Sequence, residues 1–487
     1  MLVHEIMCGL DTDIAYIDGD RRITYGDLKK AIEFCRARLY AAGVRKGDRV
    51  AILSRNSPEF VFAYLAIASL GAVVVPINFQ LSMREKAFIL RNAEVHYMFS
   101  YEDVDYESQM PDYVGGIEVV DIALAGVDSG APIVPPADIQ DDDVAAIIYT
   151  SGTTGFPKGA VLSHKNIVSN ALQYRDVLNL SSKEIVLCVL PLYHCFAWTC
   201  NVMGVLSCGA VSVMLDTFAP KETVDIIVKY KVTALFVVPS ICALLTKFAT
   251  KEAMQSIRLT VIGGTALPEK IAQDYKAKFD LEILEGYGLS ECSPVVAVNP
   301  PGRVKYGSIG LPLCFTKVRT VRADGTDTDV NEPGELLIQS PSVMQGYWKL
   351  PEETAKTISK DGWLHTGDVA RIDADGYIYI VDRIKDMIIS MGENVYPREI
   401  EELVYHYEGI KEAAVIGIPD KLRGQAGCLF YAVQEGARVD VKALRKYLVQ
   451  NLANYKVPRE YREIEALPKT STGKPAKKVL SAMYEGE

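Results

Sequence analysis

Short apolar segments alternate with helical patterns along most of this chain, and the alternation limits the folds open to it. Residues 49–53 have the branched apolar side chains of a buried strand, residues 58–70 predict a helix, and residues 72–76 predict a second strand. Because the joints are short, such strand–helix–strand units predict a parallel sheet covered by helices. The same alternation returns over residues 232–284. We therefore expect an α/β fold.

A change of pattern further along the chain predicts smaller parts. Over residues 307–380, short strand patterns are separated by Asp-Gly turns, which predicts a small β subdomain. After residue 385, helices and strands alternate over roughly 100 residues, the size of a separate α+β domain. We expect a large N-terminal domain of helix-covered sheets over residues 1–384, which includes the β subdomain, and a small C-terminal domain over residues 385–487.

The segment from Thr150 to Gly159 places hydroxyl side chains, glycines and one lysine between two expected strands. Glycines let a backbone approach a ligand closely, hydroxyls and amides donate to phosphate oxygens, and Lys158 adds a positive charge. The segment differs from the common P-loop, because Lys158 follows Phe156-Pro157 and no helix begins directly after it. It indicates either a polyphosphate-binding loop or a flexible surface loop, since clusters of Ser, Thr and Gly are commonly loops.

Charge and cysteine usage exclude several classes of function. The formal net charge of −10 argues against a nucleic-acid partner, which needs a basic face. The ten cysteines form no CxxC pair, so zinc and thioredoxin-like chemistry have no support. Most of them lie among apolar residues, as free thiols do in a reducing compartment, and the N-terminus has no signal-peptide pattern. We expect a cytoplasmic protein.

One uncharged stretch, residues 185–215, is long enough to span a bilayer. It also contains Pro191, His194 and Asn201, and polar groups inside a bilayer are costly. A buried helix preceded by a loop is therefore the favoured interpretation. We expect no transmembrane segment, and we leave transient membrane contact and a homodimer open.

Further motifs place polar residues or glycines at expected strand ends and turns. Each one alone has an ordinary interpretation: a core histidine, a glycine-rich turn, a solvated run of charges or a flexible tail. A carboxylate on such a turn is also suited to accept hydrogen bonds from ribose or to bind a hard metal ion. These motifs are Pro191–Trp198, Gly263-Gly264, Glu285–Glu291, Thr366–Asp368, Asp382–Asp386 and Pro468–Lys474.

Taken in order, the motifs resemble those of the acyl-activating, AMP-forming superfamily, also called adenylate-forming enzymes. It includes acyl- and aryl-CoA synthetases, adenylation domains of peptide synthetases and firefly-type luciferases. The resemblance runs from about Thr24 to Lys474. It implies an enzyme that joins a carboxylate to the α-phosphate of ATP, expels pyrophosphate and then lets the thiol of CoA displace AMP. ATP, Mg²⁺ and CoA are the cofactors implied, and the small C-terminal domain would be mobile.

The resemblance also implies residue roles. Lys474 would stabilise charge during adenylation, His194 would position the carboxylate, and Lys385 would be the hinge between the domains. Thr150 and Glu291 would bind Mg²⁺. The remaining contacts would be Thr150, Ser151, Gly152, Thr153, Thr154 and Lys158 to the β- and γ-phosphates; Gly264, Glu285, Gly286 and Tyr287 to adenine; Ser290 to the α-phosphate; Asp368 and Arg383 to ribose; and Gly392 to pantetheine.

The acyl pocket implied by the resemblance has small or apolar walls. An unpaired buried charge is costly, so amino acids and dicarboxylates are poor candidates. The neighbouring sequence looks most like bacterial fatty-acyl-CoA synthetases, and a fatty-acyl-CoA ligase is our leading hypothesis. An aryl-CoA ligase, an enzyme that loads an acyl carrier protein, and a non-catalytic nucleotide-binding or luciferase-like protein are the alternatives. The expected walls are Phe196, Trp198, Gly263, Gly288, Pro294 and Val295, with a plain core position as the alternative for Trp198.

Overall fold

The structure is a computed structural model that describes residues 1–102, 116–150, 157–390, 393–469 and 475–486. The chain divides into two compact units. The first comprises residues 1–267, 271–317 and 338–364, and the second comprises residues 268–270, 318–337 and 365–487. The predicted fold class is confirmed, because helices and sheets build a large N-terminal part and a smaller C-terminal one. The boundary at residues 384/385 stays a prediction.

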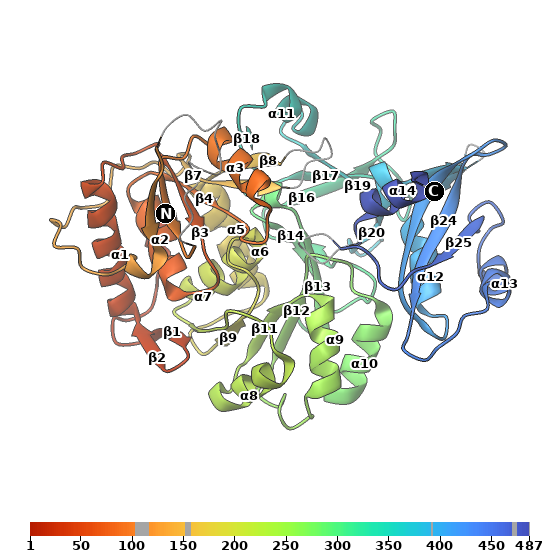
Figure 1. The fold of residues 1–487 in the computed structure, drawn as a ribbon, viewed down its shortest axis with the longest axis horizontal. Coiled ribbons are helices and arrows are strands. Elements are labelled where there is room, and N and C mark those ends of the chain that lie inside the picture. The colour runs from red at the N-terminus through yellow and green to blue at the C-terminus, as the bar shows by residue number, and fades with distance from the viewer. Residues whose placement is uncertain (103–115, 151–156, 391–392, 470–474, 487) are drawn as a thin grey trace. The chain divides into compact units, whose positions relative to one another are not determined.

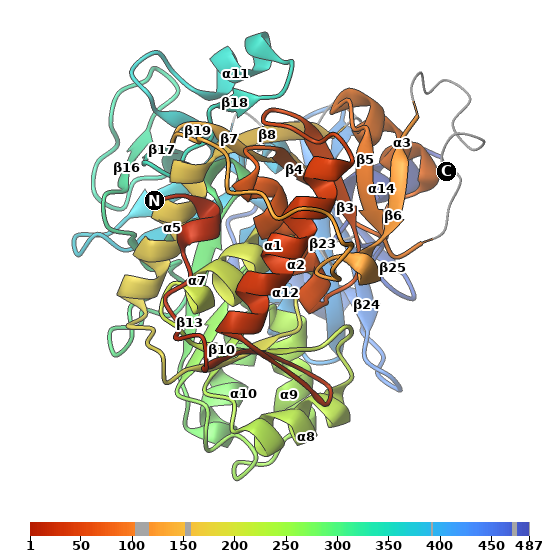
Figure 2. The same ribbon diagram turned by 90° about the vertical axis from the view of Figure 1, so that its left-hand side faces the viewer.

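A seven-stranded sheet of the first unit carries the glycine-rich segment. Its order is β18-β8-β7-β4-β3-β5-β6 (Figures 1 and 2). The strands from β7 to β6 run parallel, β8 is antiparallel to β7, and β18 is antiparallel to β8. The predicted strand, helix and strand at residues 49–76 are β3, α2 and β4. The strands are β3 (Arg49–Leu53), β4 (Val73–Pro76), β5 (Tyr97–Ser100), β6 (Glu118–Asp121), β7 (Val144–Thr150), β8 (Lys158–Ser163) and β18 (Gly346–Tyr347).

Helix starts around this sheet follow local capping chemistry. Helix α1 (Tyr25–Ala41) begins where the Thr24 hydroxyl accepts a hydrogen bond from the Asp27 amide, and the Asp27 carboxylate accepts from the Thr24 amide in return. Helix α2 (Pro58–Ser69) has Ser57 as its cap and proline at its first position. The two helices pack against each other, as Figure 2 shows. Helix α5 (His164–Val177) follows β8 directly and has Ser163 as its N-cap.

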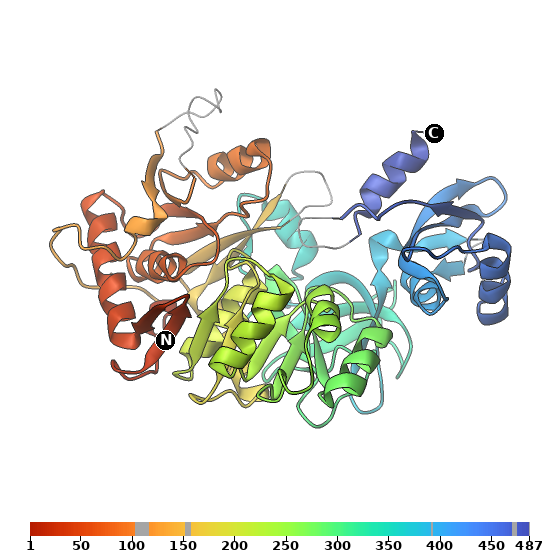
Figure 3. The ribbon, with the colours of Figure 1, turned by 60° about the horizontal axis from the view of Figure 1, so that its bottom comes forward.

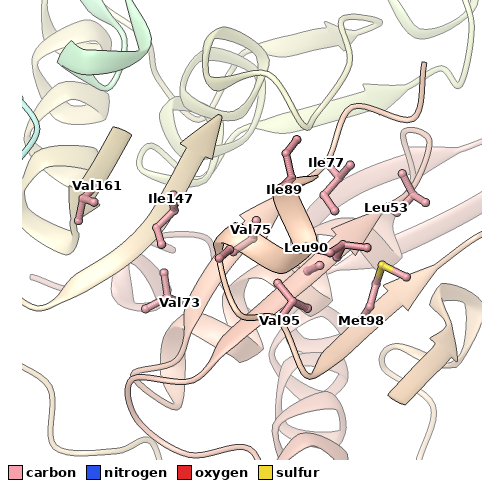
Figure 4. Close-up of a cluster of buried hydrophobic side chains, with 12 residues drawn as sticks. Leu53, Val73, Val75, Ile77, Ile89, Leu90, Val95, Met98, Ile147 and Val161 are labelled. Atoms are coloured by element: carbon pink, nitrogen blue, oxygen red, sulfur yellow. The ribbon is translucent and has the colours of Figure 1, made fainter. Parts of the chain in front are cut away.

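A cluster of buried apolar side chains fixes the hairpin of β7 and β8 to the rest of the sheet. It joins Ile147 of β7 and Val161 of β8 to β3, β4 and β5, and Ile89 and Leu90 bring in helix α3 (Met83–Asn92) (Figure 4). The partly buried rings of Tyr149 and Trp348 pack against the same cluster. Full burial of such side chains stabilises a fold by about 1.5–3 kcal/mol each, so the base of the hairpin is rigid.

The second sheet of this unit has nine strands in the order β15-β14-β13-β12-β11-β9-β10-β1-β2. Strands β13 to β1 run parallel, and helices α8 (Pro220–Tyr230) and α9 (Pro239–Phe248) lie next to each other in the yellow-green part of the chain in Figure 3. Helix α10 (Glu269–Phe279) precedes β13. The strands are β1 (Ile14–Asp18), β2 (Arg21–Thr24), β9 (Ile185–Cys188), β10 (Val211–Met214), β11 (Ala234–Val237), β12 (Leu259–Ile262), β13 (Ile283–Gly288), β14 (Val295–Val298) and β15 (Leu311–Pro312).

The uncharged stretch at residues 185–215 is divided among several elements of this unit. It forms β9, a loop, the short helix α6 (Cys195–Ala197), a π-helical turn at Trp198–Met203, the short helix α7 (Gly204–Leu206) and β10. Residues 195–206 are buried, as predicted for a core helix preceded by a loop. Of the helices in the described parts of the chain, none is both long and apolar enough to cross a membrane.

The second unit contains two smaller sheets. The first has the order β16-β17-β19-β20 and the turns at Gly325 and Gly376 have positive φ, as the predicted Asp-Gly turns require. The second is built on the long hairpin of β23 and β24, against which α12 (Pro397–Tyr405) packs. The strands are β16 (Lys317–Val321), β17 (Gly334–Gln339), β19 (Leu364–Ile372), β20 (Ile378–Arg383), β21 (Ile388–Ser390), β22 (Glu393–Val395), β23 (Ile410–Asp420), β24 (Gly424–Val433) and β25 (Glu460–Glu463).

Candidate active site

The glycine-rich segment is the connection of the β7–β8 hairpin. Thr150 and Lys158 are register partners at the end of that hairpin next to the connection, and the Thr150 hydroxyl lies 3.4 Å from the Lys158 carbonyl oxygen, to which it donates. Both predicted strands that flank the segment are present. Ser151, Gly152, Thr153 and Thr154 lie outside the described residues. The hairpin therefore brings a hydroxyl and an ammonium side chain to the two ends of the expected phosphate loop.

The ammonium group of Lys158 lies between a carboxylate and an aromatic ring. Its Nζ is 2.7 Å from Oε2 of Glu353, on helix α11 (Pro351–Thr357), and 5.3 Å from the centre of the Tyr347 ring. Lys158 and Lys356 hold the pKa of the Glu353 carboxyl at about 2, so this carboxylate is ionised at neutral pH. The positive charge of Lys158 is thus kept close to the hairpin by two neighbours from β18 and α11.

Glu291 joins the same constellation through Tyr347. It lies in the short 3₁₀ turn Ser290–Cys292 that follows β13, and the Tyr347 hydroxyl donates to its Oε1 at 2.8 Å. Burial, with the Glu291 charge, raises the pKa of Tyr347, so its hydroxyl keeps its proton. The backbone amide of Met344 donates to the Glu291 carbonyl and fixes the turn. One tyrosine therefore connects the expected metal ligand with the expected phosphate ligand.

The oxygen atoms of Thr150 and Glu291 are chemically suitable ligands for Mg²⁺. Within the described residues there is no cluster of three or more His, Cys, Asp or Glu side chains that would hold a metal by itself. Proteins commonly bind Mg²⁺ through one or two carboxylates while substrate phosphates and waters complete the shell. When bound, the ion would neutralise phosphate charge.

The residues expected around adenine lie at the ends of two neighbouring parallel strands, β12 and β13. Gly264 follows β12 and has φ of +83°, which favours glycine. Glu285 on β13 is buried, and its Oε1 accepts a hydrogen bond from the Leu267 amide at 3.1 Å, which holds the loop after β12. Gly286 and Tyr287 follow on the same strand. Carboxyl ends of parallel strands are where open α/β sheets commonly bind ligands.

The His194 segment reaches the Ser290 turn through a neighbouring cysteine. His194 caps the short helix α6, and its Nδ1 accepts from the Phe196 amide at 3.2 Å. The sulfur of Cys195 lies 3.2 Å from the Ser290 hydroxyl oxygen. Burial raises the pKa of the Cys195 thiol to about 11, so it is a neutral partner. His194 and Ser290, expected to contact the carboxylate and the α-phosphate, are therefore brought into one region.

The expected acyl wall is closely packed around three short backbone segments. A Cβ atom at Gly263 would lie 3.1 Å from the Phe196 ring, which is a tight contact, and one at Gly288 would lie 2.2 Å from the Pro294 carbonyl oxygen, so Gly288 has no room for a side chain. Val295 exchanges two backbone hydrogen bonds with the buried side chain of Asn170, at 2.6 and 3.0 Å.

Trp198 has a different environment from the rest of that wall. Its ring stacks on Tyr64 of helix α2 with 3.6 Å between ring centres, and the side chain is 4% exposed. This packing against α2 agrees with the core position that the sequence left as the alternative. Phe196 is thus the aromatic residue of the segment that contacts Gly263.

The second unit holds the other expected site residues. Asp368 on β19 and Arg383 on β20 are register partners, and Nε of Arg383 lies 3.3 Å from Oδ1 of Asp368. Lys385 lies in the 3₁₀ turn directly after β20, where burial, reinforced by the Arg383 charge, lowers its pKa. Gly392 and Lys474 lie outside the described residues.

The sequence patterns did not identify several residues that the structure places near the candidate site residues. Tyr347 and Glu353 reach Lys158 from about 190 positions away along the chain, and no local pattern links them to the glycine-rich segment. In the second unit, Lys477 pairs with Glu401 at 2.8 Å. Burial alone would lower the pKa of Lys477, but the carboxylates of Glu401 and Asp382 outweigh it and raise that pKa. Lys477 lies close in sequence to the Gly473-Lys474 motif, and this proximity could have marked it as a candidate residue.

Comparison with known proteins gives matches over nearly the whole chain. A family model described as "AMP-binding enzyme" matches residues 10–348, and one described as "AMP-binding enzyme C-terminal domain" matches residues 399–474. A feruloyl-CoA synthase from an Amycolatopsis species is 35% identical over 460 residues, covering 94% of this chain and 93% of that protein. A long-chain-fatty-acid–CoA ligase from Bacillus subtilis (strain 168) is 33% identical over 500 residues, covering 93% and 89%.

The fold agrees with these matches. The crystal structure of ATP-bound MatB from Rhodopseudomonas palustris superimposes with a TM-score of 0.93 at 29% identity and covers 100% of this chain and 99% of that one. The superfamily resemblance noted from the motifs is confirmed, and so are ATP, CoA and Mg²⁺ as the cofactors. Because the first family model alone spans more than half of the sequence, the chain belongs to the AMP-binding enzyme family and is an adenylate-forming acid–thiol ligase that makes acyl-CoA.

Proposed function

We propose that the acid activated by this ligase is a fatty acid. The observation that carries the proposal is the apolar character of the expected wall: the Phe196 ring packs on Gly263, and Val295 is buried. A second charge on the acid would need a partner there, and none of the expected wall residues is charged. Each methylene buried in such a site contributes about 0.8 kcal/mol, which favours long alkyl chains. The 33% identity to long-chain-fatty-acid–CoA ligases supports the same substrate class.

The residue roles implied by the motifs are part of this proposal. A carboxylate oxygen of the acid attacks the α-phosphorus of ATP, the bond to pyrophosphate breaks, and acyl-AMP forms. Two anions must approach each other, so Lys158 on the phosphates and Lys474 between carboxylate and α-phosphate would act by neutralising charge. His194 would position the carboxylate, since this attack removes no proton. The CoA sulfur then attacks the acyl carbon, the thiol proton passes to solvent, the bond between the acyl carbon and the phosphate oxygen breaks, and AMP leaves.

The two half-reactions separate the role of Lys474 from that of the rest of the site. Lys474→Ala should remove acyl-AMP formation far more than thioester formation from supplied acyl-AMP. The proposed domain boundary at residues 384/385 with Lys385 as hinge predicts this difference, because the small domain would withdraw Lys474 before CoA attacks. Equal loss in both half-reactions, each followed by chromatography of the products, would contradict the role.

An aromatic acid is the second candidate substrate. A feruloyl-CoA synthase is 35% identical to this chain, and an anthranilate CoA ligase crystallised with anthranoyl-AMP has a TM-score of 0.91 at 25% identity. The Phe196 ring beside Gly263 offers a flat apolar surface that also suits an aromatic ring. The wall is therefore compatible with two shapes of apolar acid.

Pyrophosphate release with ATP and Mg²⁺ tests the choice. The panel contains saturated fatty acids of increasing length, hydroxycinnamic and benzoic acids, and a dicarboxylic acid as the charged control. Each acid is tested with CoA and with an acyl carrier protein as acceptor. We expect the highest kcat/KM with a long-chain fatty acid and CoA. A higher value with an aromatic acid would replace the fatty-acid proposal, and a preference for the dicarboxylate would refute the apolar pocket.

We also propose a cytoplasmic location, because all ten cysteines are free and most of them are buried. Binding to anionic lipid vesicles and the mass of the purified protein in solution will test the transient membrane contact and the homodimer that the sequence leaves open.

A further inference from the structure

The phosphate-loop lysine is paired with a carboxylate that none of the motifs includes. Nζ of Lys158 lies 2.7 Å from Oε2 of Glu353; the Lys158 side chain is 15% exposed and the Glu353 side chain is 32% exposed, so solvent screens this pair in part. The second oxygen of Glu353 lies 2.8 Å from Nζ of Lys356. The two lysines keep Glu353 ionised. The cluster of Lys158, Glu353 and Lys356 has a positive net charge.

Backbone hydrogen bonds place Glu353 beside Lys158. Strand β18 pairs with β8, and the Trp348 amide donates to the Gly159 carbonyl at 2.7 Å, one residue after Lys158. The Thr354 hydroxyl then accepts from the Tyr347 amide at 2.8 Å, which ties α11 to β18. Backbone pairing therefore fixes the start of helix α11 relative to the hairpin and places Glu353 next to Lys158.

A polyphosphate at this loop must share Lys158 with Glu353. The ammonium group attracts the phosphate oxygens, and the carboxylate 2.7 Å from it repels them. Solvent reduces this repulsion because the Glu353 side chain is 32% exposed, and we expect loss of the carboxylate to raise the affinity by roughly tenfold. A site without the carboxylate would bind polyanionic ligands such as ATP and pyrophosphate more tightly and release them more slowly.

We propose that Glu353 is a positioning residue of the phosphate site: it holds Lys158 and limits the affinity for polyphosphate, so that pyrophosphate leaves after adenylation. This inference rests on the phosphate-binding role proposed above for Lys158. It assigns to α11 a part in product release, whereas Tyr347 of the preceding strand β18 contacts Glu291.

Charge-neutral substitutions on α11 test the inference. Glu353→Gln keeps the shape and removes the charge, and Glu352→Gln makes the same change one residue earlier, at an exposed position of the same helix. Calorimetric titration with pyrophosphate should give about tenfold tighter binding for Glu353→Gln and no change for Glu352→Gln. In steady-state assays the KM for ATP should fall, and inhibition by added pyrophosphate should strengthen. Glu353→Asp should restore the affinity towards that of the wild type.

Weaker or unchanged pyrophosphate binding by a folded Glu353→Gln variant would overturn the inference, because the carboxylate would then help binding or take no part in it. A Lys158→Gln variant that binds pyrophosphate as tightly as the wild type would overturn it as well. Thermal unfolding confirms that each variant is folded. The titrations contain no acid substrate, so their outcome does not depend on the fatty-acid proposal. Failure of the fatty-acid proposal would instead be seen as no pyrophosphate release with fatty acids.

Discussion

The buried imidazole of His164 should make the first unit lose stability in mildly acidic solution. His164 is fully buried at the first position of α5, and its Nδ1 accepts a hydrogen bond from the Val3 amide at 3.2 Å. An acceptor nitrogen carries no proton, so the contact requires the neutral ring. Burial, assisted by the nearby His4 ring, lowers the pKa of His164 from 6.5 to about 4. The other charged groups around it are Asp143, Glu5 and Lys46.

The sign and size of the effect follow from this shift. Between pH 6.5 and 4 the unfolded chain binds a proton at His164 and the folded chain does not, so the free energy of unfolding decreases as the pH falls. With values of 6.5 and about 4, the full loss is about 2.5 × 1.36, or about 3.4 kcal/mol, and at pH 5 it is about 2 kcal/mol. Above pH 7 the contribution no longer depends on pH.

Urea unfolding of the first unit at pH 7.5 and pH 5.0 measures this difference. Wild-type protein should lose about 2 kcal/mol more than a His164→Gln variant, whose side chain does not titrate but still offers an acceptor to the Val3 amide. Groups that titrate elsewhere cancel in the comparison. His96→Gln, at an exposed position of the same unit, is the matched control and should behave as the wild type. An equal pH dependence of wild type and His164→Gln would refute the reasoning.

Three further substitutions test contacts described above. Tyr347→Phe keeps the ring beside the phosphate-loop lysine but removes the donor to the expected metal ligand, so the Mg²⁺ concentration for half-maximal pyrophosphate release should rise several-fold; an unchanged Mg²⁺ titration would contradict this. Asn170→Leu leaves the buried amide and carbonyl of Val295 unpaired and should lower the free energy of unfolding by about 2–4 kcal/mol in urea, whereas a loss below 1 kcal/mol would count against it. Lys477→Met leaves two carboxylates of the second unit without their cation, so thermal unfolding should occur at lower temperature, and lowering the pH towards 5 should recover part of the loss; no recovery would exclude the charge explanation.

Local sequence patterns were sufficient for the elements that carry the site. The strand and helix patterns at residues 49–76 correspond to β3, α2 and β4, and the strands on both sides of the glycine-rich segment are β7 and β8. The Thr24 capping box and the positive φ of the glycine turns follow from short-range chemistry that a sequence displays directly. The hairpin geometry that brings Thr150 to Lys158 also follows from two strands separated by one connection.

Side-chain partners from distant parts of the chain were not predictable in the same way. Glu353 looks like a solvated helix residue, and its role emerges only when β18 pairs with β8. Asn170 looks like a polar residue on a helix surface, yet it is buried and bonds the backbone of Val295. A buried polar group needs a hydrogen-bond partner, and here the partner comes from an element far away in the sequence. Such contacts depend on how the elements pack and not on the local periodicity of apolar residues.

The two-residue strand β18 also determines when during synthesis the proposed phosphate site is complete. A nascent chain that has reached residue 340 already contains β7, β8 and the Glu291 turn, but it lacks Tyr347 and Glu353. Pairing across so large a sequence separation is slow compared with formation of the local hairpin. The lysine is therefore present long before its two neighbours, and the complete set is assembled only after the ribosome has made α11.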